Sequence, residues 1–134
     1  MKEESIFHQK SFSFALRILR LSKYLRSQKE FILADQILRS GTSIGANLEE
    51  GSGSHTRKEF ALRVSTAYKE ARETKYWLRL LKEGSILSDK QINPLLIKCE
   101  ELIKLLGSAQ LTLSGRKKKS TQINLTTHST VKKI

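Results

Sequence analysis

The chain has one cysteine, one proline, few aromatic side chains and no long apolar run in its 134 residues. A lone Cys99 excludes an internal disulfide and fits a reducing compartment. Three scattered histidines, His8, His55 and His128, lack metal-ligand spacing, so we expect no metal and no cofactor. No stretch approaches the roughly 18 consecutive apolar residues of a membrane span, and the N-terminus shows no apolar signal segment. These absences predict a soluble, cytoplasmic protein of a single domain.

Positive charge is in clear excess, with 25 Lys and Arg against 13 Asp and Glu and a formal net charge of +12. Such an excess favours polyanionic partners such as RNA, DNA or an anionic membrane. Six of the cations follow Gly115 without one acidic residue, in a segment that has no sustained apolar period. We therefore predict a folded part, residues 1–114, and a basic tail, residues 115–134, that is disordered when alone.

Apolar residues recur with the helical period and almost never with the alternation of a strand. The pattern predicts four helices, over about 5–28, 30–51, 56–84 and 88–113. Short connections between helices of similar length favour an all-α, antiparallel up-down-up-down four-helix bundle. The predicted core stripes are Phe14, Ile18, Leu21 and Leu25; Ile37, Gly41, Ile44 and Leu48; Phe60, Val64, Ala67, Ala71 and Leu78; and Leu95, Cys99, Leu102, Leu106 and Leu113.

Two helix starts have a recognisable cap. Thr56 with Glu59, and Ser88 with Gln91, have the spacing of capping boxes, and Leu87 with Ile92 that of a hydrophobic staple. Pro94 conflicts with a straight start of the last helix, because proline lacks an amide donor and crowds the preceding turn. We predict a kink or a one-turn offset there.

The first and third helices are apolar on two sides. Phe12, Leu16 and Leu19 lie nearly opposite the Phe14 stripe, and Leu62, Tyr76 and Leu80 lie opposite the Phe60 stripe. A homo-oligomer formed through these two helices would bury the second stripes. The alternative is a wide core face with stray surface apolar residues, which are normal in any protein.

The segment RSGTSIGANLEEGSG, residues 39–53, is rich in glycine, hydroxyl groups and carboxylates. It has neither the lysine of a Walker loop nor the preceding strand of a dinucleotide fingerprint. We interpret it as a thin helix face that lets a neighbouring backbone come close, with Asn47 and Glu50 holding nearby groups by hydrogen bonds. The residues of the predicted thin face are Ser40, Gly41, Ser43, Gly45 and Ala46.

The pattern RSxTSIxANLxEG in this segment, followed by Lys58-Glu59-Phe60, resembles the hallmark of the "four helix bundle protein" family. That family includes proteins encoded in intervening sequences of bacterial 23S ribosomal RNA genes. The resemblance covers about residues 5–113, and the proline usual within the motif is Gly45 here. Its structural motif positions in this chain are Arg39, Ser43, Asn47, Glu50 and Gly51.

The resemblance implies a cyclic homopentamer of antiparallel four-helix bundles. It also implies distant kinship to the accessory variability protein of diversity-generating retroelements, a basic pentamer associated with a reverse transcriptase and nucleic acid. Charge and resemblance together favour a protein that binds the backbone of RNA or DNA. The candidate binding residues are Arg17, Arg20, Lys23 and Arg26 on the first helix; Lys69, Arg72, Tyr76 and Arg79 on the third; and Arg116, Lys117, Lys118 and Lys119 in the tail.

Three functions remain open on the sequence. The first is a non-enzymatic oligomeric scaffold that binds nucleic acid, and the second is an adaptor that docks a partner enzyme such as a reverse transcriptase. The third is a hydrolase or nuclease built around Glu49, Glu50, His55 and Glu59. Adjacent Glu49 and Glu50 point about 100° apart on a helix, and Glu59 belongs to a cap, so we expect no enzyme and no catalytic residues.

Overall fold

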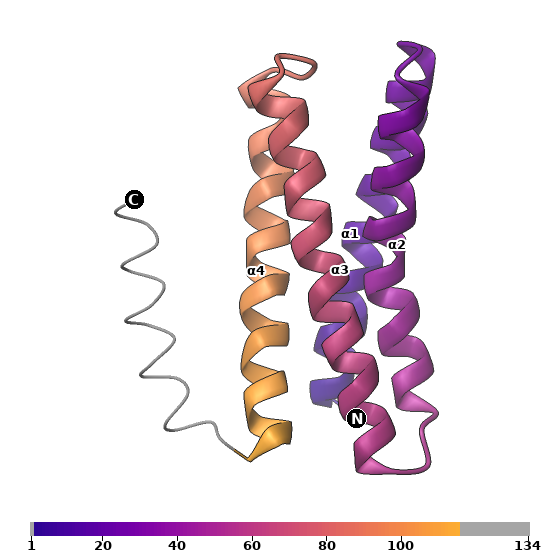
Figure 1. Ribbon diagram of the computed structural model, residues 1–134, viewed down its shortest axis with the longest axis vertical. Coiled ribbons are helices and arrows are strands. Elements are labelled where there is room, and N and C mark those ends of the chain that lie inside the picture. Colours follow the sequence, from indigo (N-terminus) through magenta and orange to yellow (C-terminus); the bar gives the residue numbers. More distant parts are fainter. Residues whose placement is uncertain (1, 116–134) are drawn as a thin grey trace, which may run out of the picture.

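A computed structural model describes residues 2–115 of the chain, and these form four α-helices without a strand (Figure 1). The helices are α1 (Lys2–Ser27), α2 (Phe31–Ser52), α3 (Arg57–Glu83) and α4 (Asp89–Ser114). The predicted all-α class and the four predicted helices are confirmed. The tail cations Arg116 to Lys119 lie outside the described residues. No helix in the described part combines the length and apolar character needed to cross a bilayer.

Each helix packs mainly on its neighbour in the sequence, and the contact between α1 and α4 is the smallest among the helix pairs that touch. Short connections join the helices, which lie side by side in Figure 1. The Ser22 hydroxyl in the last turns of α1 donates to the Ala34 carbonyl near the start of α2, at 3.1 Å. Lys82 at the end of α3 likewise donates to Asn93 of α4, at 2.9 Å. The arrangement is that of a four-helix bundle.

The core consists of the stripes that the helical period predicts. All members are buried except Phe60 and Leu113, which are partly buried and pack against the core at the helix ends. Burial of such side chains is the main term that favours folding, at roughly 1.5–3 kcal/mol for each large aliphatic residue. The remaining buried hydrophobic residues are Ala34, Leu81, Leu87 and Ile92.

The caps at the starts of α3 and α4 differ in detail. Ser88 and Gln91 form the complete capping box that the sequence predicts. At α3, the Thr56 hydroxyl accepts from the Glu59 amide at 3.0 Å, but the Glu59 carboxylate accepts from the amide of His55 at 3.1 Å. The Glu59 carboxylate therefore binds the amide of the residue before Thr56, not that of Thr56 as the predicted capping box requires. The amides of His55 and Glu59 both have an acceptor.

Pro94 does not delay the start of α4. The helix begins at Asp89, directly after the Ser88 cap, and continues through Pro94 to Ser114. Of the two predicted alternatives, the one-turn offset is therefore wrong, and the kink at Pro94 stays a prediction. The complete cap fixes the first turn, and the exposed position of Pro94 leaves water able to solvate the carbonyl that lacks an amide partner.

Candidate nucleic-acid interface

Two glycines of α2 let α1 approach closely. A Cβ atom added at Gly41 would lie 2.7 Å from Cγ2 of Ile18, closer than real Cβ contacts occur. At Gly45 it would lie 3.3 Å from the Ser11 hydroxyl. The prediction that small residues of this segment admit a neighbouring helix is confirmed at these two positions.

The predicted single thin face is wrong, because successive helix residues turn by about 100° and the five small residues spread over several directions. Ser40 is fully buried on the other side, where its hydroxyl lies 2.9 Å from that of Thr74 on α3. The Ser43 hydroxyl donates to the Arg39 carbonyl of its own helix at 2.7 Å. Ala46 is exposed.

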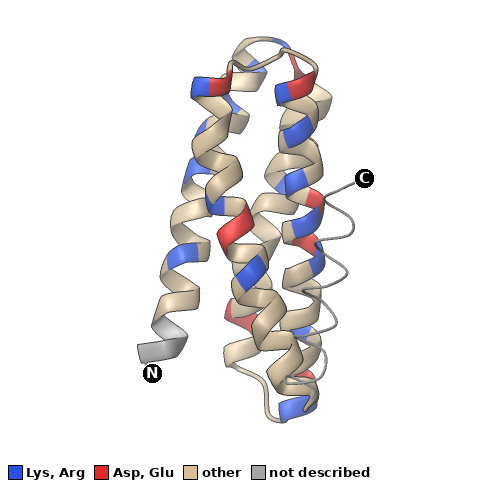
Figure 2. Cartoon of the chain, turned by 90° about the vertical axis from the view of Figure 1, so that its left-hand side faces the viewer, with Lys and Arg blue, Asp and Glu red and all other residues tan. Residues whose placement is uncertain are grey.

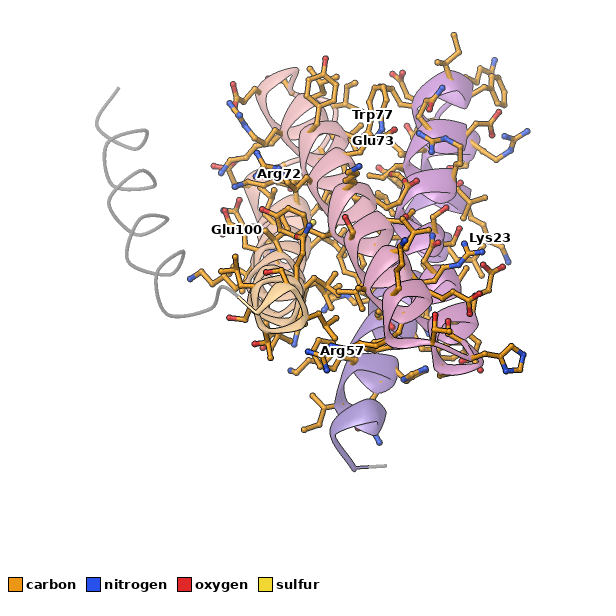
Figure 3. The ribbon with its side chains drawn as sticks, turned by 60° about the horizontal axis from the view of Figure 1, so that its bottom comes forward. Lys23, Arg57, Arg72, Glu73, Trp77 and Glu100 are labelled. Atoms are coloured by element: carbon orange, nitrogen blue, oxygen red, sulfur yellow. The ribbon has the colours of Figure 1, made fainter. Side chains whose placement is uncertain are left out.

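Arg39 connects α2 to α3 near the middle of the bundle. Its guanidinium pairs with Glu73 and lies 3.5 Å from Oε1 of Glu70. Glu73 also accepts a hydrogen bond of 2.9 Å from the indole of Trp77. Figure 3 shows Glu73 and Trp77 together on the side of α3 that faces α2.

A second connection between α2 and α3 lies about two helical turns further along α2. Arg63 of α3 donates to the Asn47 amide oxygen at 3.2 Å and pairs with Glu50 at 2.8 Å. Gly51 makes room for it, since a Cβ there would lie 3.1 Å from Cβ of Arg63 and 3.3 Å from the Phe60 ring. The prediction that a facing side chain is held by a hydrogen bond is confirmed for Asn47, whereas Glu50 holds the same Arg63 through an ion pair, and the motif fastens α2 to α3.

The four residues of the enzyme hypothesis have separate roles. Glu50 is paired with Arg63, and Glu59 caps α3. Glu49 lies 3.7 Å from the imidazole of His8 on α1. Within the part of the chain that the structure describes, no three His, Cys, Asp or Glu side chains gather as a metal site would require.

The cations of α1 form a surface almost without acidic neighbours. Between Glu4 and Glu30 the sequence has no Asp or Glu, and Figure 2 shows Lys and Arg recurring along the helix that begins at N. Arg20, Lys23 and Arg26 are exposed and Arg17 is half-buried. Arg26 alone among them is engaged, because it pairs with Asp35 of α2 at 2.6 Å and lies over the Phe31 ring. The absence of Asp and Glu from residues 5–29 is the sequence feature that could have identified this surface.

The cations of α3 are more strongly engaged. Arg79 pairs with Glu83 at 3.1 Å, as its spacing predicts. Arg72 donates to the Tyr68 hydroxyl at 3.2 Å and lies over its ring. Lys69 is exposed, and Glu73, four residues further along α3, pairs with Arg39 instead of with Lys69.

Tyr76 remains available on this face. Its side chain is 57% exposed, with the ring edge against Trp77 at a centroid distance of 5.1 Å. An exposed aromatic ring among cations can stack an unpaired base. The structure therefore brings the four candidates Lys69, Arg72, Tyr76 and Arg79 onto the surface of one helix, with two of the three cations already engaged.

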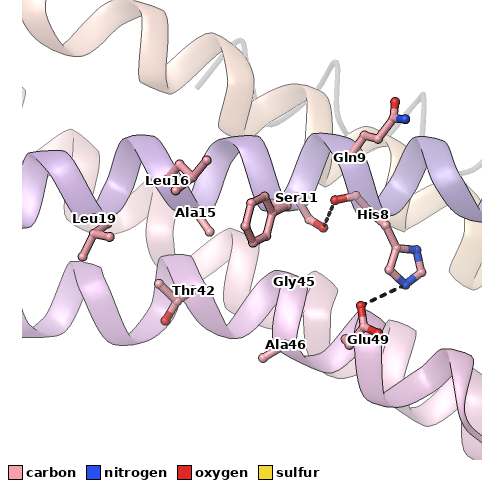
Figure 4. Close-up of a pocket in the computed structure, with 11 residues that line it drawn as sticks. His8, Gln9, Ser11, Ala15, Leu16, Leu19, Thr42, Gly45, Ala46 and Glu49 are labelled. Atoms are coloured by element: carbon pink, nitrogen blue, oxygen red, sulfur yellow. Dashed lines mark hydrogen bonds and ion pairs between the residues drawn. The ribbon is translucent and has the colours of Figure 1, made fainter.

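An apolar groove of about 800 Å³ lies between α1 and α2 (Figure 4). The second stripe of α1 forms one wall, with Phe12 66% exposed, and the small residues Gly45 and Ala46 of α2 leave the hollow. The His8–Glu49 contact lies beside it. The sequence indicated the α1 stripe, but it gave no sign that α2 completes a groove. The exposed stripe of α3, Leu62, Tyr76 and Leu80, is also confirmed.

Fold and surfaces define a four-helix, all-α protein with a basic first helix and unpartnered apolar faces. Residues 3–108 match the family model described as 23S rRNA-intervening sequence protein, and the chain belongs to that family. It is also similar to a crystal structure of a protein with unknown function from the S23 ribosomal protein family of Bacteroides thetaiotaomicron. The two are 43% identical with a TM-score of 0.75, over 78% of this chain and 97% of that one. No curated protein matches the chain.

Proposed function

We propose that the chain is a non-enzymatic, cytoplasmic bundle protein that assembles into a homo-oligomer and binds the phosphate backbone of RNA or DNA. The observation that carries this proposal is the surface of α1, where Arg17, Arg20 and Lys23 have no ion-pair partner among the side chains of residues 6–115. Cationic rows of this kind bind polyanions without reading sequence. The family name, which refers to ribosomal RNA, supports the same direction.

The proposed assembly is a ring of antiparallel, up-down-up-down bundles. The apolar groove beside α1 and the exposed stripe of α3 are different surfaces, so contact of one with the other on the next copy is heterologous and closes into a ring if the rotation fits. The family resemblance supports five subunits. In such a ring every copy adds its basic surface and its tail, which multiplies the affinity for a long polyanion through avidity.

The proposed absence of catalysis is supported by the roles of the acidic residues in the motif. Glu50 and Glu59 are committed to Arg63 and to a helix cap. If instead Glu50 acted chemically, Glu50→Gln would abolish a hydrolytic activity and leave folding intact. We expect instead that Glu50→Gln lowers the stability of the fold and that the unmodified chain has no hydrolytic activity.

The proposal is tested by binding labelled structured RNA and duplex DNA at about 50 and 200 mM salt, with the mass of the protein determined by light scattering. The full chain is compared with a version that ends at Ser114. We expect an oligomer that binds both, loses affinity steeply with salt, and binds more weakly after truncation. Comparable affinity at both salt concentrations would contradict backbone binding.

The groove between α1 and α2 favours a second candidate function, an adaptor that docks a protein such as a reverse transcriptase. An apolar groove with a small-residue wall suits a partner helix. A well-folded oligomer that binds no nucleic acid at about 50 mM salt would favour this adaptor function over the first.

A further inference from the structure

A second hollow lies between α1 and α4, two helices that make little contact with each other. This α1–α4 cleft has a volume of about 660 Å³. Its floor is apolar, formed by Leu16, Leu21 and Leu95, of which Leu21 and Leu95 belong to the buried core. Its polar groups are the Ser13 hydroxyl and the guanidinium groups of Arg17 and Arg20, all from α1. The cleft is thus basic on one wall and apolar beneath.

The two arginines of this cleft differ from the other arginines of the described residues, each of which makes a hydrogen bond or ion pair. Those contacts are Arg26 with Asp35, Arg39 with Glu70 and Glu73, Arg57 with the Thr112 carbonyl, Arg63 with Asn47 and Glu50, Arg72 with Tyr68, and Arg79 with Glu83. Among the side chains of residues 6–115, Arg17 and Arg20 have no such contact. The Arg17 side chain is half-buried and that of Arg20 is exposed, so their guanidinium groups are free to bind an anion.

Two carboxylates of α4 are already paired with lysines. Glu101 is paired with Lys10 at 3.1 Å and Glu100 with Lys75 at 3.0 Å. Arg17 and Arg20 are three residues apart, so they are neighbours on one helix face, roughly 5–6 Å between Cβ atoms. Two planar guanidinium forks at this spacing match the oxygens of a phosphate group better than they match a single carbonyl.

From these contacts we infer that the α1–α4 cleft is a phosphate-binding site, and that it holds the backbone of the nucleic-acid strand that the proposed function requires. Arg17 and Arg20 donate to phosphate oxygens, and the Ser13 hydroxyl adds a neutral donor. Lys23, one turn further along α1, continues the row toward the next phosphate. This inference rests on the proposed function and assigns its main site.

The test is binding of a labelled single-stranded RNA at several salt concentrations by the full chain and two double variants. Arg17→Gln with Arg20→Gln removes the site, and Lys58→Gln with Lys104→Gln removes the same charge from exposed positions outside every surface described above. We expect about tenfold weaker binding or more for the first and less than about threefold for the second. The salt slope of the first should fall by about 1.4, the value for two phosphate contacts on a single strand. Equal losses in the two variants would overturn the site.

A third variant separates geometry from charge. Arg17→Lys with Arg20→Lys keeps both charges but loses the bidentate forks, so we expect it to bind several-fold more weakly than the unmodified chain. Unchanged affinity would overturn the inferred arginine recognition. Helical content and melting temperature, measured for all variants, show that each is folded.

The outcomes also separate this site from the proposed function. If the unmodified chain fails to bind RNA or DNA, the function itself is wrong. If it binds and only the lysine pair matters, the function stands and the cleft is not its site. Polyglutamate that binds more tightly than RNA, with the binding lost in the Arg17→Gln, Arg20→Gln variant, would assign the cleft to an acidic protein segment and overturn the inference.

Discussion

Gly41 sits where the side chain of Ile18 leaves no space for a methyl group. We expect Gly41→Ala to destabilise the bundle by up to about 2 kcal/mol, because overpacking costs roughly 1–3 kcal/mol and the gain in helix propensity returns about 1 kcal/mol. Gly53→Ala is the matched control, since its Cβ would meet only the Glu50 carbonyl at 3.7 Å. Urea unfolding measures both. Equal free energies of unfolding for Gly41→Ala and the unmodified chain would show that α1 can shift away.

Cys99 is fully buried, and this burial raises the pKa of its thiol to about 12. In the unfolded chain the thiol ionises near pH 8.5, so above that pH only the unfolded state loses the proton and stability falls as pH rises. We expect the free energy of unfolding to drop by about 2 kcal/mol more between pH 8 and 10.5 in the unmodified chain than in Cys99→Ala. Parallel pH profiles of the two proteins would contradict this.

At the residue scale, burial could be predicted and pairing could not. Phe14, Ile18 and Leu25 are predictable because a core stripe depends only on the helical period, which the sequence carries directly. The partner of Glu73 is not predictable in this way. Lys69 is the candidate on the same helix, but Glu73 pairs with Arg39, which lies near it only because α2 packs on α3. Which side chains pair between two helices depends on how each helix is rotated about its own axis, and the local sequence does not specify that rotation.

At the scale of elements, α4 is a helix with one unfavourable residue inside it. Pro94 lies beyond the first turn, where it removes a backbone hydrogen bond, yet the helix is continuous. We expect Pro94→Ala to raise the free energy of unfolding by about 1–3 kcal/mol. Lys104→Ala, at another exposed position of α4, should change it by less than about 0.5 kcal/mol. Thermal and urea unfolding give the comparison, and a less stable Pro94→Ala protein would mean that Pro94 sets the position of the helix start.

Element identity was predictable because long periodic segments with caps leave little choice, as Ser88 and Gln91 illustrate. The role of α2 was harder to predict. Gly41 and Gly45 face α1 while Arg39, Asn47, Glu50 and Gly51 face α3, so one motif serves two interfaces. The groove and the cleft could not be predicted. Each is formed by two helices at a particular spacing, and the sequence pattern of a single helix does not determine that spacing.

At the scale of the whole molecule, α1 has three distinct surfaces. One faces the core, a second borders the groove with α2 through Phe12 and Leu19, and a third borders the α1–α4 cleft through Arg17 and Arg20. The apolar and cationic surfaces of α1 thus lie next to each other around its axis and adjoin at Leu16. Assembly through the apolar surface leaves the cationic surface on its flank, so the two proposed roles are compatible.

The apolar surface gives a direct test of assembly. Phe12→Ser with Leu19→Ser removes two large side chains from the groove and spares Leu16, which also lines the cleft. We expect light scattering to give the monomer mass of 15.3 kDa for this variant and a multiple of it for the unmodified chain. Ile97→Ser, on the exposed face of α4, is the control and should keep the oligomer mass. An unchanged mass for the double variant would remove the groove from the interface.

The same variant separates the strength of one site from the effect of repeating it. Each copy with Phe12→Ser and Leu19→Ser keeps Arg17 and Arg20, so binding of a short oligonucleotide that reaches a single cleft should change by less than about threefold. A long RNA engages several copies in the oligomer, and this avidity is lost in the monomer, so its affinity should fall by roughly 10²–10⁴. Fluorescence anisotropy with the two lengths measures the difference. Equal losses at both lengths would mean that assembly shapes the cleft itself, because avidity alone cannot weaken a contact made by one copy.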